Sequence, residues 1–248
     1  MDASRRMPWT RAEDTALSKL EALEPVVVFS PHLDDAVLSC GHFLHTHPST
    51  TVVTVLAGAP DVHHDGYNSA TTGDTYAPDA VNLRREEDRR AMEFLGVTPR
   101  WLELLDSDYA EYRPSTDYRE VIQGELAVVL DEVAPKSVFA PLGLIHPDHV
   151  AVSEACATLA TEQSYAWYFY MDLPYGIGNR RSVVRRLASL RRRLKLVRLD
   201  SYEGEPGVKQ QAMSLYQSQY EPTRQNYPKG FDETTVGTER YWRAQARR

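Results

Sequence analysis

Residues 26–35 read VVVFSPHLDD, an apolar run that turns abruptly polar. The β-branched run after Pro25 predicts a first, central strand over residues 26–29. Residues 36–45 then predict a helix, and residues 51–56 predict a second strand. This order of elements is the one that builds a parallel sheet covered by helices.

Similar alternation continues along the rest of the chain. Further helices are predicted over residues 81–95, 118–132, 150–162 and about 208–219, and further strands over residues 100–105, 136–140 and 165–171. Residues 58–78 are rich in Gly, Pro, Asp, Asn and Thr, which predicts a long surface loop with no helix. We therefore expect an α/β, Rossmann-like fold with a mostly parallel sheet, helices on both faces and an irregular C-terminal extension.

The chain of 248 residues is long for one domain but ordinary for a single α/β unit. We expect a polar N-terminal extension over residues 1–24, and a Rossmann-like α/β core that carries the catalytic residues over 25–175. Residues 176–248 are expected to form a C-terminal extension that packs on this core, so that the whole is a single domain.

The composition indicates an ordinary globular protein, with 42% hydrophobic and 25% charged residues. There is no apolar run of membrane-spanning length and no apolar signal core, so we expect a cytoplasmic protein without a membrane partner. Cys40 and Cys156 lie far apart and outside any CxxC pair, which argues against a disulfide scaffold and a thiolate zinc site. Any metal would have to use His and carboxylate ligands.

Residues 180–198 carry nine basic residues and no acidic one. A nucleic-acid surface is one interpretation of such a run. Apolar residues recur within it at spacings of four and three: Val183, Leu187, Leu190, Leu194 and Val197. This spacing favours an amphipathic helix with a solvated arginine flank and no nucleic-acid partner, although residues 194–199 also alternate as a strand does.

The first group of residues with chemical potential is His32, Asp34 and Asp35, directly after the first predicted strand. Ligands of open α/β sheets bind at the carboxyl ends of the strands. An imidazole and two carboxylates suit a borderline metal such as zinc. Because consecutive side chains point in different directions, one carboxylate can bind the metal while the other faces its water.

A second group, His146-Pro147-Asp148-His149, follows the predicted strand 136–140. Pro147 suits the first helical position, so His146 would cap the helix and His149 would lie one turn inside it. Together the two groups supply three protein ligands and leave a fourth position open, which is typical of a catalytic zinc site. A further cluster at residues 63–65 (HHD) lies in the long loop and is interpreted as solvated or substrate-adjacent.

Five motifs carry a resemblance to a known family: PHLDD at 31–35 followed by Gly41, RREED at 84–88 leading to Leu95-Gly96, HPDH at 146–149, YMDLPY at 170–175 and YQSQ at 216–219. Between residue 26 and about residue 219 the sequence resembles the PIG-L/LmbE-like zinc deacetylases. These enzymes remove acetyl groups from N-acetylglucosaminyl compounds and related natural products.

The resemblance implies a role for each matching residue. It implies that His32, Asp35 and His149 ligate one Zn²⁺ and that Asp34 is the general base. His146 would stabilise the oxyanion and protonate the leaving amine. Asp148 would tune His146, and Arg84, which has a second arginine, Arg85, beside it, would reach substrate hydroxyls.

The chain also departs from the family pattern. Many members have HPxDDE, whereas here Pro31 precedes His32, Leu33 occupies the usual proline position and Ala36 replaces the acid. These departures bear on substrate class more than on the metal site.

The residues support the same chemistry independently. Zinc lowers the pKa of its water from about 15.7 towards about 7, so that Asp34 could remove a proton at neutral pH. Fe²⁺ would suit a His/Asp site as well. The proton for the departing amine could come from His146 or Asp34. The expected function is hydrolysis of an N-acyl group, acetyl above all, on an amino-sugar-containing small molecule, such as a natural-product intermediate.

Other functions stay open. The long loop and the aromatic residues 165–175 would suit a zinc amidase that acts on a non-sugar N-acyl metabolite. A nucleotide-binding module lacks the expected GxGxxG after the first strand. A non-catalytic metal-binding module would need a fourth protein ligand, and homo-oligomerisation is left open.

Overall fold

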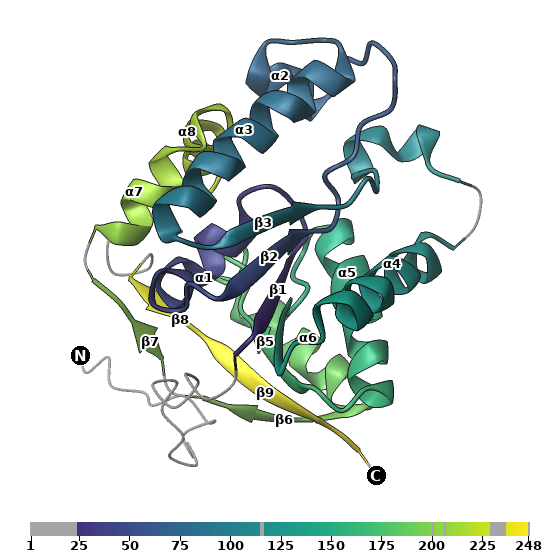
Figure 1. Cartoon of the computed structure of the whole chain (residues 1–248), viewed down its shortest axis with the longest axis vertical. Helices are drawn as coiled ribbons and strands as arrows, with labels where there is room; N and C mark the ends of the chain where they lie inside the picture. The colour runs from purple at the N-terminus through teal and green to yellow at the C-terminus, as the bar shows by residue number, and fades with distance from the viewer. Residues whose placement is uncertain (1–23, 115–116, 200, 206, 229–236, 248) are drawn as a thin grey trace.

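The computed structural model describes residues 24–114, 117–199, 201–205, 207–228 and 237–247. Seven of the strands in this described part form one sheet, in the order β3-β2-β1-β4-β5-β9-β6 (Figure 1). The strands of this sheet are β1 (Val26–Ser30), β2 (Thr50–Thr54), β3 (Thr98–Trp101), β4 (Ser137–Pro141), β5 (Ala166–Tyr170), β6 (Leu194–Arg198) and β9 (Tyr241–Ala246). The expected N-terminal extension lies, apart from Glu24, outside the described residues.

Five strands, β3 to β5 in sheet order, run parallel, whereas β9 is antiparallel to both of its neighbours. Two short strands, β7 (Tyr202–Glu203) and β8 (Thr238–Glu239), pair apart from this sheet. All five residues of β1 are buried, as expected for a central strand covered on both faces. The mostly parallel Rossmann-like α/β fold is therefore confirmed.

Helices cover both faces of the sheet. They are α1 (Asp35–Thr46), α2 (Tyr67–Thr72), α3 (Ala77–Leu95), the 3₁₀ helix η2 (Ser107–Tyr112), α4 (Tyr118–Val133), α5 (Pro147–Glu162), α6 (Arg180–Leu190), α7 (Val208–Ser214) and α8 (Gln217–Asn226). Figure 1 shows α1, α3 and α7 on one face and α4, α5 and α6 on the other, in agreement with the contacts of α1 with α7 and of α4 with α5. None of these described helices has the length and apolarity that crossing a bilayer requires.

The sheet brings the two predicted ligand groups to one edge. β1 and β4 are parallel neighbours, with Val28 opposite Phe139. α1 begins at Asp35, five residues after β1 ends, and α5 begins at Pro147, six residues after β4 ends. Both connections leave the carboxyl end of the sheet, so their polar side chains face the same space.

The prediction that residues 58–78 contain no helix is wrong, because α2 lies among them. The carboxylate of Asp108 accepts hydrogen bonds of 2.8 Å from both Tyr67 N and Asn68 N at the start of α2. Gly73 ends the helix with a φ of 78°. The partner that caps α2 lies 40 residues away in the chain, so no local pattern could reveal it.

The C-terminal third differs most from expectation. The basic segment is not one helix, since α6 ends at Leu190 and β6 follows, which is the alternative strand interpretation of residues 194–199. Likewise, the helix predicted over residues 208–219 is divided into α7 and α8. β3 begins two residues before its predicted start. The last strand, β9, was not predicted at all, and it lies inside the main sheet between β5 and β6.

Candidate active site

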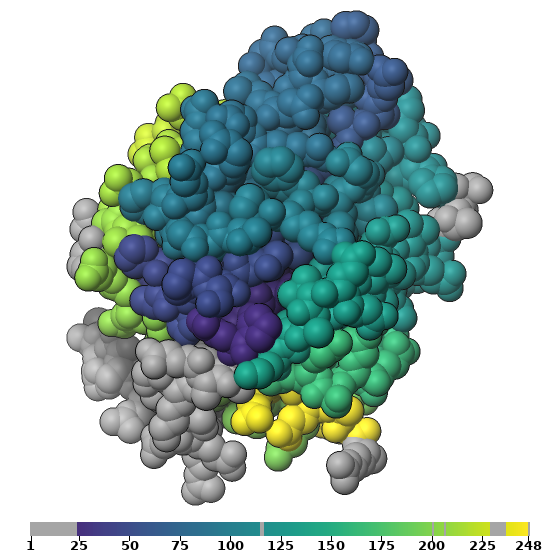
Figure 2. Space-filling model, viewed as in Figure 1, coloured from purple at the N-terminus to yellow at the C-terminus, as the bar shows by residue number. Residues whose placement is uncertain are grey.

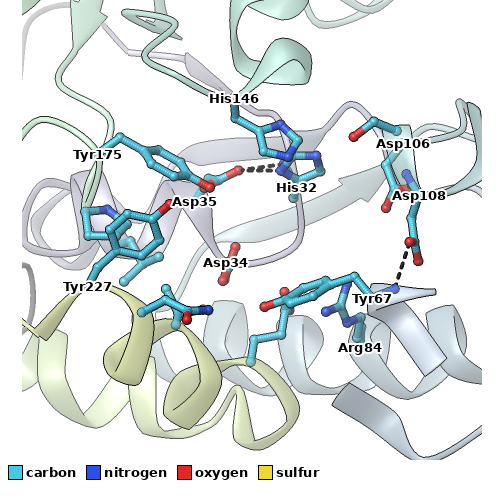
Figure 3. Close-up of a pocket in the computed structure, with 16 residues that line it drawn as sticks. His32, Asp34, Asp35, Tyr67, Arg84, Asp106, Asp108, His146, Tyr175 and Tyr227 are labelled. Atoms are coloured by element: carbon cyan, nitrogen blue, oxygen red, sulfur yellow. Dashed lines mark hydrogen bonds and ion pairs between the residues drawn. The ribbon is translucent and has the colours of Figure 1, made fainter. Parts of the chain in front are cut away.

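Three imidazoles from the two sheet-edge connections converge. His32, His146 and His149 each offer a ring nitrogen, and these atoms all lie within 4.8 Å of one another. In the part of the chain that the structure describes, this is the group of His, Cys, Asp or Glu donors that could hold one metal ion. Figure 3 shows His32 and His146 side by side at the upper rim of the cavity.

Asp35 lies among these imidazoles. Its Oδ2 accepts a 2.9 Å hydrogen bond from His32 N and lies 3.2 Å from His32 Nδ1 and 3.0 Å from His149 Nε2. Burial by itself would raise the pKa of Asp35, but His149 and His32 outweigh this effect and hold the pKa well below its usual range. The carboxylate of Asp35 is therefore negatively charged, and it lies between the ring nitrogens of His32 and His149.

This donor set fits a divalent cation. His149 Nε2 is buried and, despite its distance to Asp35, makes no hydrogen bond of good geometry. Burial lowers the pKa of His149, yet Asp35 and Asp172 raise it overall to about 9, so the surroundings favour positive charge here. Imidazole and carboxylate donors are those that zinc prefers when no thiolate is present.

Asp172 orients His149 from behind. Its Oδ1 lies 2.6 Å from His149 Nδ1, and its Oδ2 accepts a 2.9 Å hydrogen bond from Gly143 N. A carboxylate on the far nitrogen of a ligating histidine sets the tautomer and the ring orientation. Asp172 was not predicted as a site residue; its one signal in the sequence was the YMDLPY motif at 170–175.

Asp34 has an unusual backbone and faces the cavity (Figure 3). Its φ of 146° and ψ of −28° lie in a region that side-chain-bearing residues rarely adopt. Such strain persists where the surrounding structure imposes it, and it clusters at active sites. Burial, followed by the charge of Asp35, raises the pKa of Asp34 well above its ordinary value, although Arg84 opposes the shift.

His146 caps α5 as expected, and its Nδ1 accepts a 3.3 Å hydrogen bond from Asp148 N. Burial, His32 and His149 lower its pKa to about 4, so that it is neutral near pH 7. The charge of Asp148 opposes this lowering of the His146 pKa, but Asp148 lies nearer to other partners. Its oxygens accept hydrogen bonds of 2.7 Å from Ser107 N and from Arg113 Nη2, and Oδ2 lies 3.2 Å from His32 Nε2 but 3.9 Å from His146 Nδ1.

These groups open onto a cavity of about 360 Å³. The two arginines at the start of the RREED motif separate here. Arg84 lines the cavity, where its guanidinium donates to Asn68 and Thr71 and lies 5.2 Å from the ring centroid of Tyr67. Arg85 instead donates to Ala57 O and to the exposed Glu103.

Other cavity residues were not singled out from the sequence, although the long loop and the aromatic residues 165–175 were interpreted as a pocket lining suited to a non-sugar substrate. They come from α2, the segment before η2, the segment after β5, and α8, and include Tyr67, Asp106, Tyr175, Gln219 and Tyr227. His63 and His64 do not join the cluster. His64 lies 3.4 Å from Glu111 Oε1, and His63 lies 3.4 Å from Thr75 Oγ1.

Comparison with known proteins identifies a family and several similar solved structures. The sequence model of the PIG-L family, described as GlcNAc-PI de-N-acetylase, matches residues 27–160. No curated protein shows a significant match. A deacetylase from the biosynthesis pathway of teicoplanin, solved as a bog complex, is 26% identical, with 90% of this chain and 98% of that chain covered and a TM-score of 0.72. The teicoplanin deacetylase Orf2, in a form described as zinc inhibited, is 27% identical over the same shares, with a TM-score of 0.71.

Two further solved structures are similar. The A40926 pseudoaglycone deacetylase Dbv21 is 26% identical, with 88% of this chain and 96% of that chain covered and a TM-score of 0.67. The N,N'-diacetylchitobiose deacetylase from Pyrococcus horikoshii is 16% identical, with 94% and 88% covered and a TM-score of 0.54, and it shares the fold. The family match spans more than half of the chain and includes the motifs that meet at the sheet edge, so this chain belongs to the PIG-L family of de-N-acetylases.

Proposed function

We propose that this protein is a zinc-dependent N-deacetylase, which hydrolyses an N-acyl group, acetyl above all, on an amino-sugar-containing natural-product intermediate. One observation carries this proposal: three imidazoles and Asp35 converge at a cavity into which a second carboxylate, Asp34, also points. The relatives described as deacetylases of teicoplanin biosynthesis and of the A40926 pseudoaglycone support the substrate class.

We propose His32, Asp35 and His149 as the zinc ligands. Asp35 supplies the negative charge, and Asp172 fixes the orientation of His149. Bound zinc would polarise the amide carbonyl and lower the pKa of a water molecule. His146 is the alternative third or fourth donor, because its ring nitrogen belongs to the same cluster.

Asp34 transfers protons in the reaction, and His146 donates a hydrogen bond. Asp34 is a carboxylate whose raised pKa makes it a stronger base than a solvated aspartate, and it removes a proton from the attacking water. His146 accepts a hydrogen bond at Nδ1, so its neutral ring carries the proton on Nε2. That N–H donates to the oxyanion, a contribution of about 3 to 4 kcal/mol to transition-state stabilisation. Asp34 then returns its proton to the departing amine.

The cavity wall suits a hydroxylated acceptor. Arg84 offers a guanidinium beside Tyr67, and Asp106 offers a carboxylate. On the opposite side, Tyr175 and Tyr227 lie with ring centroids 5.3 Å apart. These aromatic rings would also suit a non-sugar N-acyl metabolite, which is the alternative substrate class.

The test combines elemental analysis with acetate release from N-acetylglucosamine derivatives and a glycopeptide pseudoaglycone carrying an N-acyl amino sugar. Wild type, His149→Ala and the matched control His63→Ala are compared at low and at excess zinc, since a relative is described as zinc inhibited. We expect about one zinc per chain and acetate release, both lost only in His149→Ala. Bound zinc without release from any amino-sugar compound would favour the other substrate class, and a chain that binds no metal would refute the proposal.

A further inference from the structure

A distant side chain holds the peptide group between Leu33 and Asp34. Gln219 Nε2 donates a 2.7 Å hydrogen bond to Leu33 O, and Gln219 itself is only 5% exposed. Gln219 belongs to α8, 186 residues further along the chain. Other carbonyls of this turn accept from backbone groups, as Pro31 O does from Leu56 N and Asp34 O from Leu38 N. The Leu33 carbonyl thus depends on a side chain.

The same peptide group controls the backbone of Asp34. The angle φ of Asp34 describes rotation about the bond from the nitrogen of this peptide group to the Cα of Asp34. Its value of 146° is unfavourable for a residue with a side chain. A hydrogen bond that holds the Leu33 carbonyl in place therefore opposes relaxation of the peptide group and keeps the Asp34 side chain directed at the cavity.

Gln219 is itself firmly anchored. The neighbouring Ser218 donates from N and from Oγ to the buried carboxylate of Glu87, at 2.8 and 2.6 Å. Tyr216 OH donates a 2.7 Å hydrogen bond to Asp88, which is buried beside Glu87 on α3. The YQSQ motif is thus bound to the helix that also presents Arg84, and its last residue reaches the turn.

We propose that Gln219 is a positioning residue for Asp34. Its amide holds the Leu33–Asp34 peptide group in the orientation that directs the Asp34 carboxylate into the cavity. The proposal rests on the proposed function in so far as Asp34 acts as the base. A direct role in substrate binding is the competing explanation, because Gln219 also lines the cavity.

The test uses Gln219→Met, which keeps the length of the side chain but removes the donor. Gln217→Met is the matched control, because Gln217 is exposed and lies two residues earlier on the same helix. We expect kcat of Gln219→Met to fall by about 10- to 100-fold, the loss typical of a misplaced reacting group, with KM and zinc content unchanged. The control should behave as wild type. A raised KM with unchanged kcat would overturn the proposal in favour of substrate binding, and unchanged kinetics would overturn it outright.

Crystal structures of wild type and Gln219→Met give a readout that does not need activity. We expect the Asp34 φ to leave the positive region and its carboxylate to move in the variant. An unmoved Asp34 would refute the positioning role. If wild type releases no acetate but Asp34 moves in Gln219→Met, the positioning role stands and only the proposed function is refuted. If Gln219→Met does not fold, Gln219→Leu, which also lacks a donor, takes its place with the same expectations. A wild-type structure without the bond to Leu33 O would overturn the proposal.

Discussion

At the scale of single residues, Asp34 and Asp35 show how surroundings separate two adjacent carboxylates. Asp35 lies between two histidines, which lower its pKa against the effect of burial. Asp34 is subject to burial and to the charge of Asp35, and its pKa is raised. A pair of carboxyl groups whose pKa values are driven apart commonly divides the tasks of ligand and base.

This division predicts opposite phenotypes for two isosteric substitutions. Asp34→Asn should keep its zinc and lose kcat by about 10²- to 10⁴-fold, since a general base is removed. Asp35→Asn should lose affinity for zinc, because the anion between the histidines is gone. Elemental analysis and steady-state kinetics on both variants check this. The reverse pattern would exchange the two assigned roles.

Asp172 should affect zinc affinity although it does not itself bind the metal. Asp172→Asn weakens the partner of His149 Nδ1, so zinc affinity should fall by about 10- to 100-fold. Competition against a chromogenic chelator measures the change, with the exposed Asp131→Asn as the control. Equal zinc affinity in wild type and Asp172→Asn would show that Asp172 supports the fold alone.

At the scale of elements, α3 connects the cavity wall to the YQSQ motif. One face of this helix presents Arg84 to the cavity, while Glu87 and Asp88 hold the YQSQ motif. Asp88 also accepts a 2.8 Å hydrogen bond from Trp101 Nε1 on β3. A single turn of α3 therefore links an edge strand, the cavity wall and α8.

Asp88 should make stability depend on pH. Burial raises its pKa from 3.8 to about 6, although its bonds to Trp101 and Tyr216 oppose the shift. The folded state then binds this proton more tightly than the unfolded state, so the contribution of Asp88 to the free energy of unfolding decreases as pH rises from about 4 to about 6. Urea unfolding of wild type and Asp88→Asn at several pH values should show the variant gaining relative to wild type across this interval. A difference that does not change with pH would contradict the raised pKa.

At the scale of the whole molecule, the candidate metal site lies at one edge of the sheet, and the buried core is packed independently of this site. The buried core consists of β-branched, aromatic and aliphatic residues from both helical layers. The space-filling view shows the described helices and strands on this side of the molecule as one continuous body (Figure 2). The core therefore does not need the metal to be complete.

Removing zinc with a chelator should accordingly abolish hydrolysis while the far-ultraviolet circular dichroism and the cooperative thermal transition persist. The melting temperature should fall only as far as the lost free energy of zinc binding lowers the free energy of unfolding. Readdition of zinc should restore acetate release. Collapse of the dichroism signal on chelation would instead indicate a structural metal.

Local patterns were sufficient for much of this architecture. The β-branched run of β1 and its helix α1 were predicted because apolar periodicity and turn residues act within a few positions. The same holds for the HPDH turn at the start of α5, where Pro147 and the capping His146 are local signals. The resemblance to the family rested on five short motifs, HPDH among them, and the family match confirms it.

The sequence alone thus determined the α/β class, the family and the two polar turns that bear the candidate ligands, because each depends on residues close together in the chain. Only the tertiary structure decided which residues complete the site. Asp172 behind His149, Gln219 on Leu33 O and the cap of α2 by Asp108 all join segments that lie 23 to 186 residues apart. Equally, β9 is an interior strand because it pairs with both β5 and β6 and satisfies backbone hydrogen-bonding groups along their edges. Such pairings follow from the packing of the whole chain, and no short stretch of sequence encodes them.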